Sequence, residues 1–262
     1  MGQHAPTLAR PVAADRPAGR AAPAERDRLG VALRYLGPIT AVAMVAMLYM
    51  AFIYAPTEET QGDAQRIFYA HFGAALVMYV AYFVTFVGGI LYLWKRSEAW
   101  DMLARSSAEV GLLFTTIVLL SGSIWGKTIW GTWWAWDARL TSTLILWFIY
   151  AGYLMLRAYG GETPQIARSA AVVGIIGFID VPIINQSVRW WRTLHPAPIV
   201  ERENPALPGS MLLTAGVALV AFILLYAFLL LHRLRVEQLR VEVAALRQQA
   251  MFEEDSGLRT KD

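Results

Sequence analysis

Apolar stretches long enough to cross a bilayer alternate with short charged stretches along most of the chain. A hydrocarbon core about 30 Å thick requires about 20 residues of helix. Such stretches must be helical, because a backbone exposed to lipid has to satisfy its own hydrogen bonds. The pattern predicts an all-α integral membrane protein, with six transmembrane helices in one bundle. The six stretches are residues 37–55, 72–94, 110–126, 140–156, 169–188 and 210–231.

The positive charges are distributed unevenly over the segments between these stretches. If the N-terminus is cytoplasmic, the cytoplasmic segments hold 17 of the 23 Lys and Arg residues. Cytoplasmic loops of membrane proteins carry an excess of Lys and Arg, so both termini are predicted to be cytoplasmic. The net charge of +3 therefore indicates membrane orientation and not binding to nucleic acid. The cytoplasmic segments are residues 1–36, 95–109, 157–168 and 232–262.

The two ends of the chain differ from the membrane domain, which is predicted to comprise residues 36–232. Residues 1–35 are rich in Ala, Pro and Arg and lack the apolar run of a signal peptide, which is typical of a disordered cytoplasmic tail. Residues 233–262 are predicted to form a cytoplasmic amphipathic tail. Its apolar residues recur at spacings of three and four, which suits either a partner helix or the membrane surface. They are Val236, Leu239, Val243, Leu246 and Ala250.

The segment WGTWWAWDARLT, residues 130–141, holds four tryptophans in seven positions on the predicted outer side. Tryptophan has a broad flat face and one N–H donor, and it prefers the boundary between hydrocarbon and water. On a helix, Trp130, Trp133, Trp134 and Asp137 would share one face. An interfacial belt would place tryptophans at both surfaces, whereas here they gather at one. We therefore predict an aromatic platform with a charged edge, formed by Trp130, Trp133, Trp134, Trp136, Asp137 and Arg139.

The chain contains no cysteine and only four histidines. The lack of cysteine excludes disulfides, thiolate nucleophiles, iron–sulfur clusters and thiol-bound metals. His4 lies in the N-terminal tail and His232 at the cytoplasmic end of the last helix, so neither is expected to bind a ligand. His71 and His195 both lie on the predicted outer side, where the tryptophans are. The candidate chemistry therefore rests on these two imidazoles.

Haem is the ligand that this combination favours. Its iron takes an imidazole on each face, its porphyrin stacks on tryptophan, and its propionates pair with arginine. A second aromatic pair, Trp190 and Trp191, is flanked by Arg189 and Arg192, which can pair with carboxylates. A zinc site would need three or four ligands.

An ion pathway would require ionisable groups near the middle of the bilayer. Only Asp180 approaches that position, two residues before Pro182. Because proline interrupts a helix, we expect Asp180 to have a structural role. It would either pair with Arg139 or cap a broken helical turn.

Residues 130–141 resemble the tryptophan-rich WWD signature of the haem-handling superfamily of cytochrome c biogenesis. The six helices, the signature between helices three and four, and the two histidines in flanking loops resemble the CcmC family of haem exporter proteins. The resemblance covers about residues 35–232. Relatives that act as final haem lyases are longer and have an additional His pair, which this chain lacks.

The resemblance implies a haem carrier and not an enzyme, although the carrier could assist covalent attachment of haem to its chaperone. Such a protein holds haem b at the periplasmic face of the bacterial inner membrane and delivers it to a CcmE-like haem chaperone. The resemblance implies that His71 and His195 are the axial ligands of the iron and that the aromatic platform contacts the porphyrin. The expected partners are CcmA-like and CcmB-like ABC transporter subunits and a small, single-helix CcmD-like subunit.

Two other functions remain open at this stage. A small b-type cytochrome that passes electrons to a quinone would also need two histidines, but these usually face each other within the bundle. A permease subunit could contain a tryptophan cluster with a structural role only. A haem spectrum separates the permease from the other two, and transfer of haem to a chaperone separates the carrier from the cytochrome.

Overall fold

The structure is a computed structural model, and it describes the backbone of residues 23–195 and 207–259. In these two ranges the chain forms helices joined by short loops and contains no β-strand. The helices, in chain order, are α1 (Pro23–Tyr49), the π-helical turn η1 (Met50–Tyr54), the 3₁₀ turn η2 (Asp63–Arg66), α2 (Ile67–Lys95), α3 (Glu98–Trp130), α4 (Ala138–Tyr159), α5 (Pro164–Phe178), α6 (Asp180–Trp190) and α7 (Gly209–Arg259).

Six stretches of helix in the described residues are long and apolar enough to cross a membrane. Five of them contain a stretch predicted from the hydropathy pattern, and the first ends one residue short of its predicted stretch, so the prediction of an all-α protein with six membrane helices is confirmed. The protein is therefore a multi-pass membrane protein. The six stretches are Leu29–Tyr54, Asp63–Lys95, Glu98–Trp130, Ala138–Tyr159, Pro164–Trp190 and Gly209–Phe252.

The fifth membrane stretch is interrupted once, between α5 and α6. Proline cannot donate a backbone hydrogen bond, so Pro182 leaves the carbonyl of Phe178 without its helical donor. At the same place the backbone N–H of Ile179 donates to the carbonyl of Ile176 at 3.0 Å, a tighter turn than an α-helix makes. The chain turns here and resumes as α6, which leads to the loop that carries His195.

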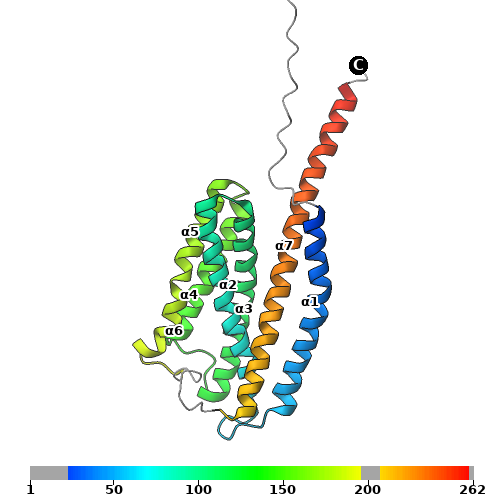
Figure 1. Cartoon of the computed structure of the whole chain (residues 1–262). Coiled ribbons are helices and arrows are strands. Elements are labelled where there is room, and N and C mark those ends of the chain that lie inside the picture. Colours follow the sequence, from blue (N-terminus) through cyan, green and yellow to red (C-terminus); the bar gives the residue numbers. More distant parts are fainter. Residues whose placement is uncertain (1–22, 196–206, 260–262) are drawn as a thin grey trace, which may run out of the picture.

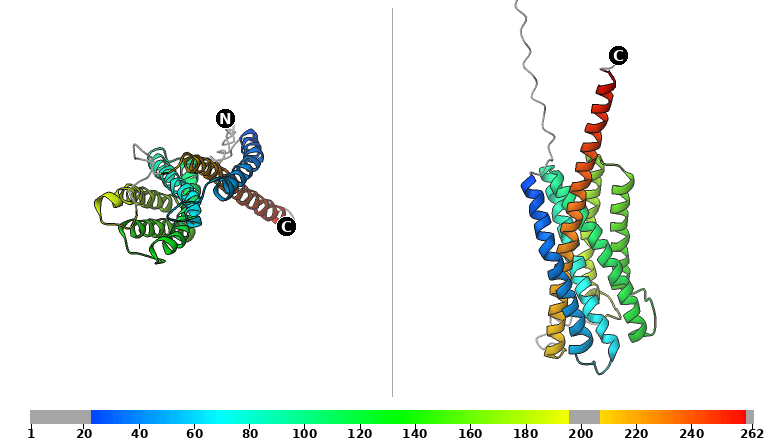
Figure 2. Two further views of the ribbon diagram at one scale, coloured as in Figure 1. Left: turned by 90° about the horizontal axis from the view of Figure 1, so that it is seen from below. Right: turned by 90° about the vertical axis from the view of Figure 1, so that its right-hand side faces the viewer.

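The bundle has α2 at its centre, in contact with α3, α5 and α7, while α1 packs against α7 at one edge (Figures 1 and 2). Aromatic side chains fill the interior. The rings of Tyr82 and Tyr150 stack with centroids 3.8 Å apart, and the hydroxyl groups of Tyr82 and Thr115 are 2.7 Å apart. A Cβ atom at Gly111 would lie 2.8 Å from the Tyr82 ring, so glycine permits this close approach of α2 and α3.

Ion pairs connect α7 to α3 near one end of the bundle. Arg233 donates to the carboxylate of Glu109, and Arg105 donates to the largely buried carboxylate of Glu237 at 3.2 Å. Helix α7 continues through residues 232 and 233 without a break and extends beyond the other helices (Figure 1). Up to Arg259, the predicted amphipathic tail is thus a continuation of the last membrane helix, and its seam residues Leu239, Val243 and Leu246 are exposed.

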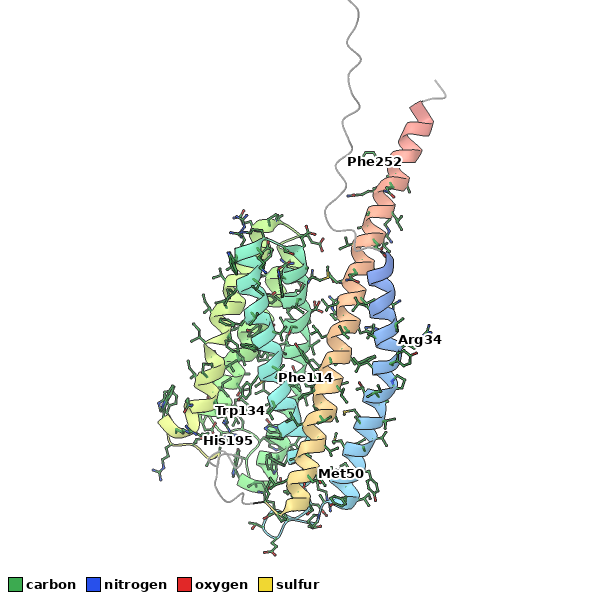
Figure 3. All side chains as sticks on the ribbon, in the orientation of Figure 1. Arg34, Met50, Phe114, Trp134, His195 and Phe252 are labelled. Carbon is green, nitrogen blue, oxygen red and sulfur yellow. The ribbon has the colours of Figure 1, made fainter. Side chains whose placement is uncertain are left out.

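The predicted N-terminal tail divides into two parts. Residues 1–22 lie outside the described residues, and residues 23–35 form the first part of α1. The start of α1 and the end of α7 lie at one end of the bundle, whereas Trp134 and His195 lie at the other (Figure 3). The two predicted candidate regions, the tryptophan segment and the loop of His195, therefore share the end of the bundle opposite to the start of α1 and the end of α7.

The first prediction concerns orientation in the membrane. Because the predicted cytoplasmic segments hold 17 of the 23 Lys and Arg residues, we expect reporter fusions after residues 165 and 262 to report the cytoplasm. A fusion after residue 132 should report the periplasm. Paired phosphatase and fluorescent reporters provide the measurement. A periplasmic signal from the fusion after residue 262 would contradict the orientation and the assignment of the site to the periplasm.

Candidate functional site

The tryptophan segment forms a loop and not a helix. Helix α3 ends at Trp130, and Gly131 follows with a φ of 74°, a left-handed conformation that favours glycine. The backbone then runs without helical structure to Asp137, where α4 begins. The prediction that Trp130, Trp133, Trp134 and Asp137 share a helical face is therefore wrong. The helix stops because glycine terminates it at one side and Asp137 starts a new helix at the other.

Asp137 connects this loop to the start of α4 and to the loop of His195. One carboxylate oxygen accepts the backbone N–H of Leu140 at 2.8 Å, which caps the N-terminus of α4. The other accepts the hydroxyl of Thr193 at 2.7 Å and the ring Nδ1–H of His195 at 2.8 Å. The Asp137 side chain is only 6% exposed, so its carboxylate is satisfied almost entirely by protein donors.

The protonation states of Asp137 and His195 follow from these bonds. Burial raises the pKa of Asp137, but the hydrogen bonds from Leu140, Thr193 and His195 outweigh burial and hold this pKa below its ordinary value. Burial lowers the pKa of His195 more than the Asp137 carboxylate raises it, and the positive charge of Arg139 lowers it further. At neutral pH, Asp137 is therefore ionised and His195 is neutral, with its proton on Nδ1.

His71 lies in the first turns of α2 and contacts the last turns of α3. Its ring Nδ1 is 2.9 Å from the Ser121 hydroxyl. The Trp125 ring packs edge-on against the imidazole, with centroids 5.8 Å apart and an interplanar angle of 63°. The Trp125 ring N–H donates to the side-chain carbonyl of Gln61 at 3.0 Å, which fixes the indole from the outer loop. His71 is thus held on two sides by α3.

The structure brings His71 and His195 to the same end of the bundle. The end of α3 connects them, because Trp125 packs against His71 and Trp130 packs against His195. Each ring uses Nδ1 for its hydrogen bond to the protein. In the described residues, neither Nε2 has a hydrogen-bond partner, so both Nε2 atoms are available to a ligand.

The predicted platform residues differ in exposure. Trp133 and Trp136 are 60% and 77% exposed, whereas Trp130 and Trp134 are half-buried. The Trp130 ring packs edge-on against His195, with centroids 5.0 Å apart. Trp190 and Trp191 are also largely exposed at the end of α6. A hollow of about 400 Å³ opens beside them, and it is lined by Ala135, Trp136, Asp137, Arg192, Thr193 and Leu194.

These residues fit a haem. Two imidazole Nε2 atoms without hydrogen bonds suit the iron, and exposed indole faces suit the porphyrin. The ring N–H of Trp134 and the Nε–H of Arg139 are buried and have no acceptor among the described residues, so both can donate to an anionic group such as a propionate. No cluster of three or more His, Cys, Asp or Glu residues occurs in the described part of the chain that could hold a bare metal ion.

The expected pairing of Asp180 with Arg139 does not form. Asp180 is the first residue of α6, and one of its oxygens is buried without a hydrogen-bond donor among the described residues. Its carboxylate does not cap the broken helix, since no side-chain cap occurs at this terminus. Asp180 therefore marks the helix break, while Arg139 belongs to the group around the histidines.

Sequence reasoning missed three residues that hold the histidines: Ser121, Trp125 and Thr193. Ser121 and Trp125 are four residues apart and face the same way on α3, so a helical projection could have paired them. Thr193 lies two residues before His195 and could have been considered as its support. What the sequence cannot supply is the partner across the bundle, because His71 and Ser121 are 50 residues apart in the chain.

The fold and the site together define a class: a multi-pass helical membrane protein with two imidazoles and an aromatic surface at one end of its bundle. The model of the CcmC family, Heme exporter protein C, matches residues 21–249. A Heme exporter protein C of Bradyrhizobium diazoefficiens is 37% identical over 215 residues, which cover 82% of this chain and 81% of the relative.

Further relatives agree with this match. A Heme exporter protein C of Escherichia coli K12 is 36% identical over 202 residues, 76% of this chain and 82% of the relative. A putative cytochrome c biosynthesis ccmC-like mitochondrial protein of Marchantia polymorpha is 35% identical over 178 residues, 68% of this chain and 75% of the relative. The chain belongs to the CcmC family of heme exporter proteins, and the resemblance found in the sequence is confirmed.

The second prediction separates the two roles of Asp137. Serine is a good N-cap but is too short to reach His195, so Asp137→Ser should keep α4 capped and lose the bond to the imidazole. Asp137→Ala should lose both and unfold more easily by about 1 kcal/mol. Thermal unfolding of the detergent-solubilised variants measures the difference. Equal stability of the two variants would contradict the capping role.

Proposed function

We propose that this protein holds haem b between His71 and His195 at the periplasmic face of a bacterial inner membrane and delivers it to a periplasmic haem chaperone during maturation of c-type cytochromes. Membership of the heme exporter family supports a role in haem handling. The observation that carries the proposal is the pair of imidazoles, each hydrogen-bonded through Nδ1 and each with an available Nε2.

Haem supplies the iron and the reactive vinyl groups, and the protein supplies positioning. In this proposal His71 and His195 bind the iron, and Trp133 and Trp136 cover the porphyrin. Arg139 and the Trp134 ring N–H receive the propionates. Asp137 acts on the iron only through His195, because its oxygens are already committed to protein donors. Covalent attachment of haem would take place on the chaperone, which this protein could assist by orienting the porphyrin.

A b-type cytochrome fits this arrangement less well. His195 follows α6 in a loop outside the membrane stretches, and Trp133 and Trp136 of the tryptophan segment are exposed rather than packed in the bundle. An exposed aromatic surface suits a cargo that must leave and a partner that must approach. The proposed partners are a CcmE-like chaperone, CcmA-like and CcmB-like transporter subunits, and a CcmD-like single-helix subunit.

The third prediction tests the two iron ligands. His71→Ala and His195→Ala should both insert into the membrane but lose the low-spin absorption spectrum of haem with two imidazole ligands, and added imidazole should restore part of it. Spectra of the purified proteins provide the measurement, with His4→Ala and His232→Ala as controls that keep the parent spectrum. An unchanged low-spin spectrum in both the His71 and the His195 variant would exclude these residues as ligands.

The fourth prediction tests delivery. Trp133→Ala and Trp136→Ala remove exposed rings from the site, so we expect less haem on a co-expressed chaperone and little change in stability. Trp94 offers a matched control, because it is 76% exposed and lies near the end of α2 that is remote from His71. Haem stain of the chaperone, normalised to the amount of this protein in the membrane, is the measurement. Full loading by the Trp133 and Trp136 double variant would show that these rings form only an interfacial belt.

A further inference from the structure

The two imidazoles of the site have different hydrogen-bond acceptors on Nδ1. The acceptor for His195 is the carboxylate of Asp137, and the atom that faces Nδ1 of His71 is the hydroxyl of Ser121. The distances are nearly equal, 2.8 and 2.9 Å, so the difference lies in chemistry and not in length. A carboxylate carries a negative charge, whereas a serine hydroxyl is neutral.

The hydroxyl of Ser121 fixes the tautomer of His71. Its oxygen is 2.6 Å from the backbone carbonyl of Ile117, which can only accept, so the single hydroxyl proton points to that carbonyl. The oxygen is therefore left to accept the Nδ1–H of His71. Asp137, when ionised, likewise can only accept from His195. Both rings consequently carry their proton on Nδ1 and present the lone pair of Nε2.

The two lone pairs are not equally strong donors to a metal. A hydrogen bond from Nδ1–H to a carboxylate moves electron density into the ring and raises the basicity of Nε2. Charge-assisted hydrogen bonds are about twice as strong as neutral ones, and burial strengthens them further. The side chains of Asp137 and His195 are only 6% and 19% exposed. His195 is therefore the stronger donor and His71 the weaker one.

Although His195 lies in a loop, hydrogen bonds hold this loop in place, so its position does not make His195 the weaker iron ligand. Thr193 ties the same loop to Asp137, and the backbone N–H of His195 donates to the Thr193 hydroxyl oxygen at 3.2 Å. Asp137 is itself fixed as the N-cap of α4. The loop is thus anchored to a membrane helix through the same carboxylate that strengthens the ligand.

We infer that the two ligands of the proposed haem site have unequal roles: His195 retains the iron, and His71 is the ligand that leaves when haem is handed over. The inference rests on the proposed function. In the exchange, the bond between the iron and Nε2 of His71 breaks, and a lone pair from a Lewis-base side chain of the acceptor forms the new bond. The iron keeps its oxidation state, and Ser121 keeps the proton of His71 on Nδ1. Ser121 and Asp137 are positioning residues, since they act on the iron only through the histidines.

The test uses the full-length protein with bound haem, reduced and mixed with carbon monoxide. Carbon monoxide can bind only after one histidine leaves, so its rate of binding reports dissociation of the weaker ligand. Ser121→Ala should raise this rate about tenfold, because loss of a partner of a ligating histidine typically weakens metal binding by 10–100-fold. Thr116→Ala is the matched control. Thr116 also lies on α3 and accepts a ring N–H, that of Trp147, which is not a ligand, so the rate should not change.

A second measurement compares haem content after purification. The His71→Ala protein should keep most of its haem through His195, and the His195→Ala protein should lose most of it. In Asp137→Asn, an amide oriented to keep the Leu140 cap would present N–H to Nδ1 of His195. The imidazole proton would move to Nε2, and the loss of haem should resemble that in His195→Ala. The membrane level of each variant shows whether it is folded.

Two outcomes would overturn the inference and leave the haem site intact: an unchanged carbon monoxide rate in Ser121→Ala, or better haem retention by His195→Ala than by His71→Ala. A different outcome would contradict the proposed function itself. In that case neither histidine substitution would change the low-spin spectrum, and the rate in Ser121→Ala would equal that of the parent.

Discussion

The absence of hydrogen-bonding solvent in the hydrocarbon core is the constraint on which the rest of this structure depends. Backbone groups inside the core must bond to one another, so the chain crosses as helices and confines irregular backbone to the ends of the bundle. The non-helical segment from Gly131 to Asp137 and the loop of His195 are therefore neighbours at one end. A site that needs extended backbone and exposed indole faces can form only there, where helices end and water begins.

One carboxylate organises that end. Asp137 starts α4, holds Thr193 and orients His195, so a single side chain links a membrane helix, an adjacent loop and a candidate ligand. Its three donors hold it in the ionised form, and the ionised carboxylate in turn fixes the proton of His195 on Nδ1, while burial keeps this imidazole neutral. Geometry and protonation thus depend on each other, which explains why an aspartate follows the tryptophans and not a longer or neutral residue.

The sequence predicted the six membrane helices because length and hydropathy alone decide whether a segment can cross a bilayer. It also pointed to the histidines and tryptophans that the structure brings to one end of the bundle, since four histidines and no cysteine leave few choices. It was wrong about the helical form of residues 130–137, because the termination at Gly131 and the cap at Asp137 outweigh the helical spacing of the tryptophans. Contacts such as His71 with Ser121 depend on the packing of α2 against α3, which periodicity within one helix cannot reveal.

A carrier must satisfy two opposed demands, since it has to orient its cargo and also release it. Two equally strong iron ligands would orient haem but make its release slow. Exposed rings without a strong iron ligand would bind haem without fixing its orientation. At about 25 cal/mol per Å², covering about 80 Å² of one ring contributes roughly 2 kcal/mol, so two exposed indoles can hold a porphyrin while one iron bond exchanges. Trp133 and Trp136 provide such exposed surfaces, and Trp136 lines the hollow together with Asp137 and Thr193. In the proposed site, the aromatic surface and the unequal histidines would be complementary: the rings would keep the porphyrin in place during the interval in which the iron changes partner.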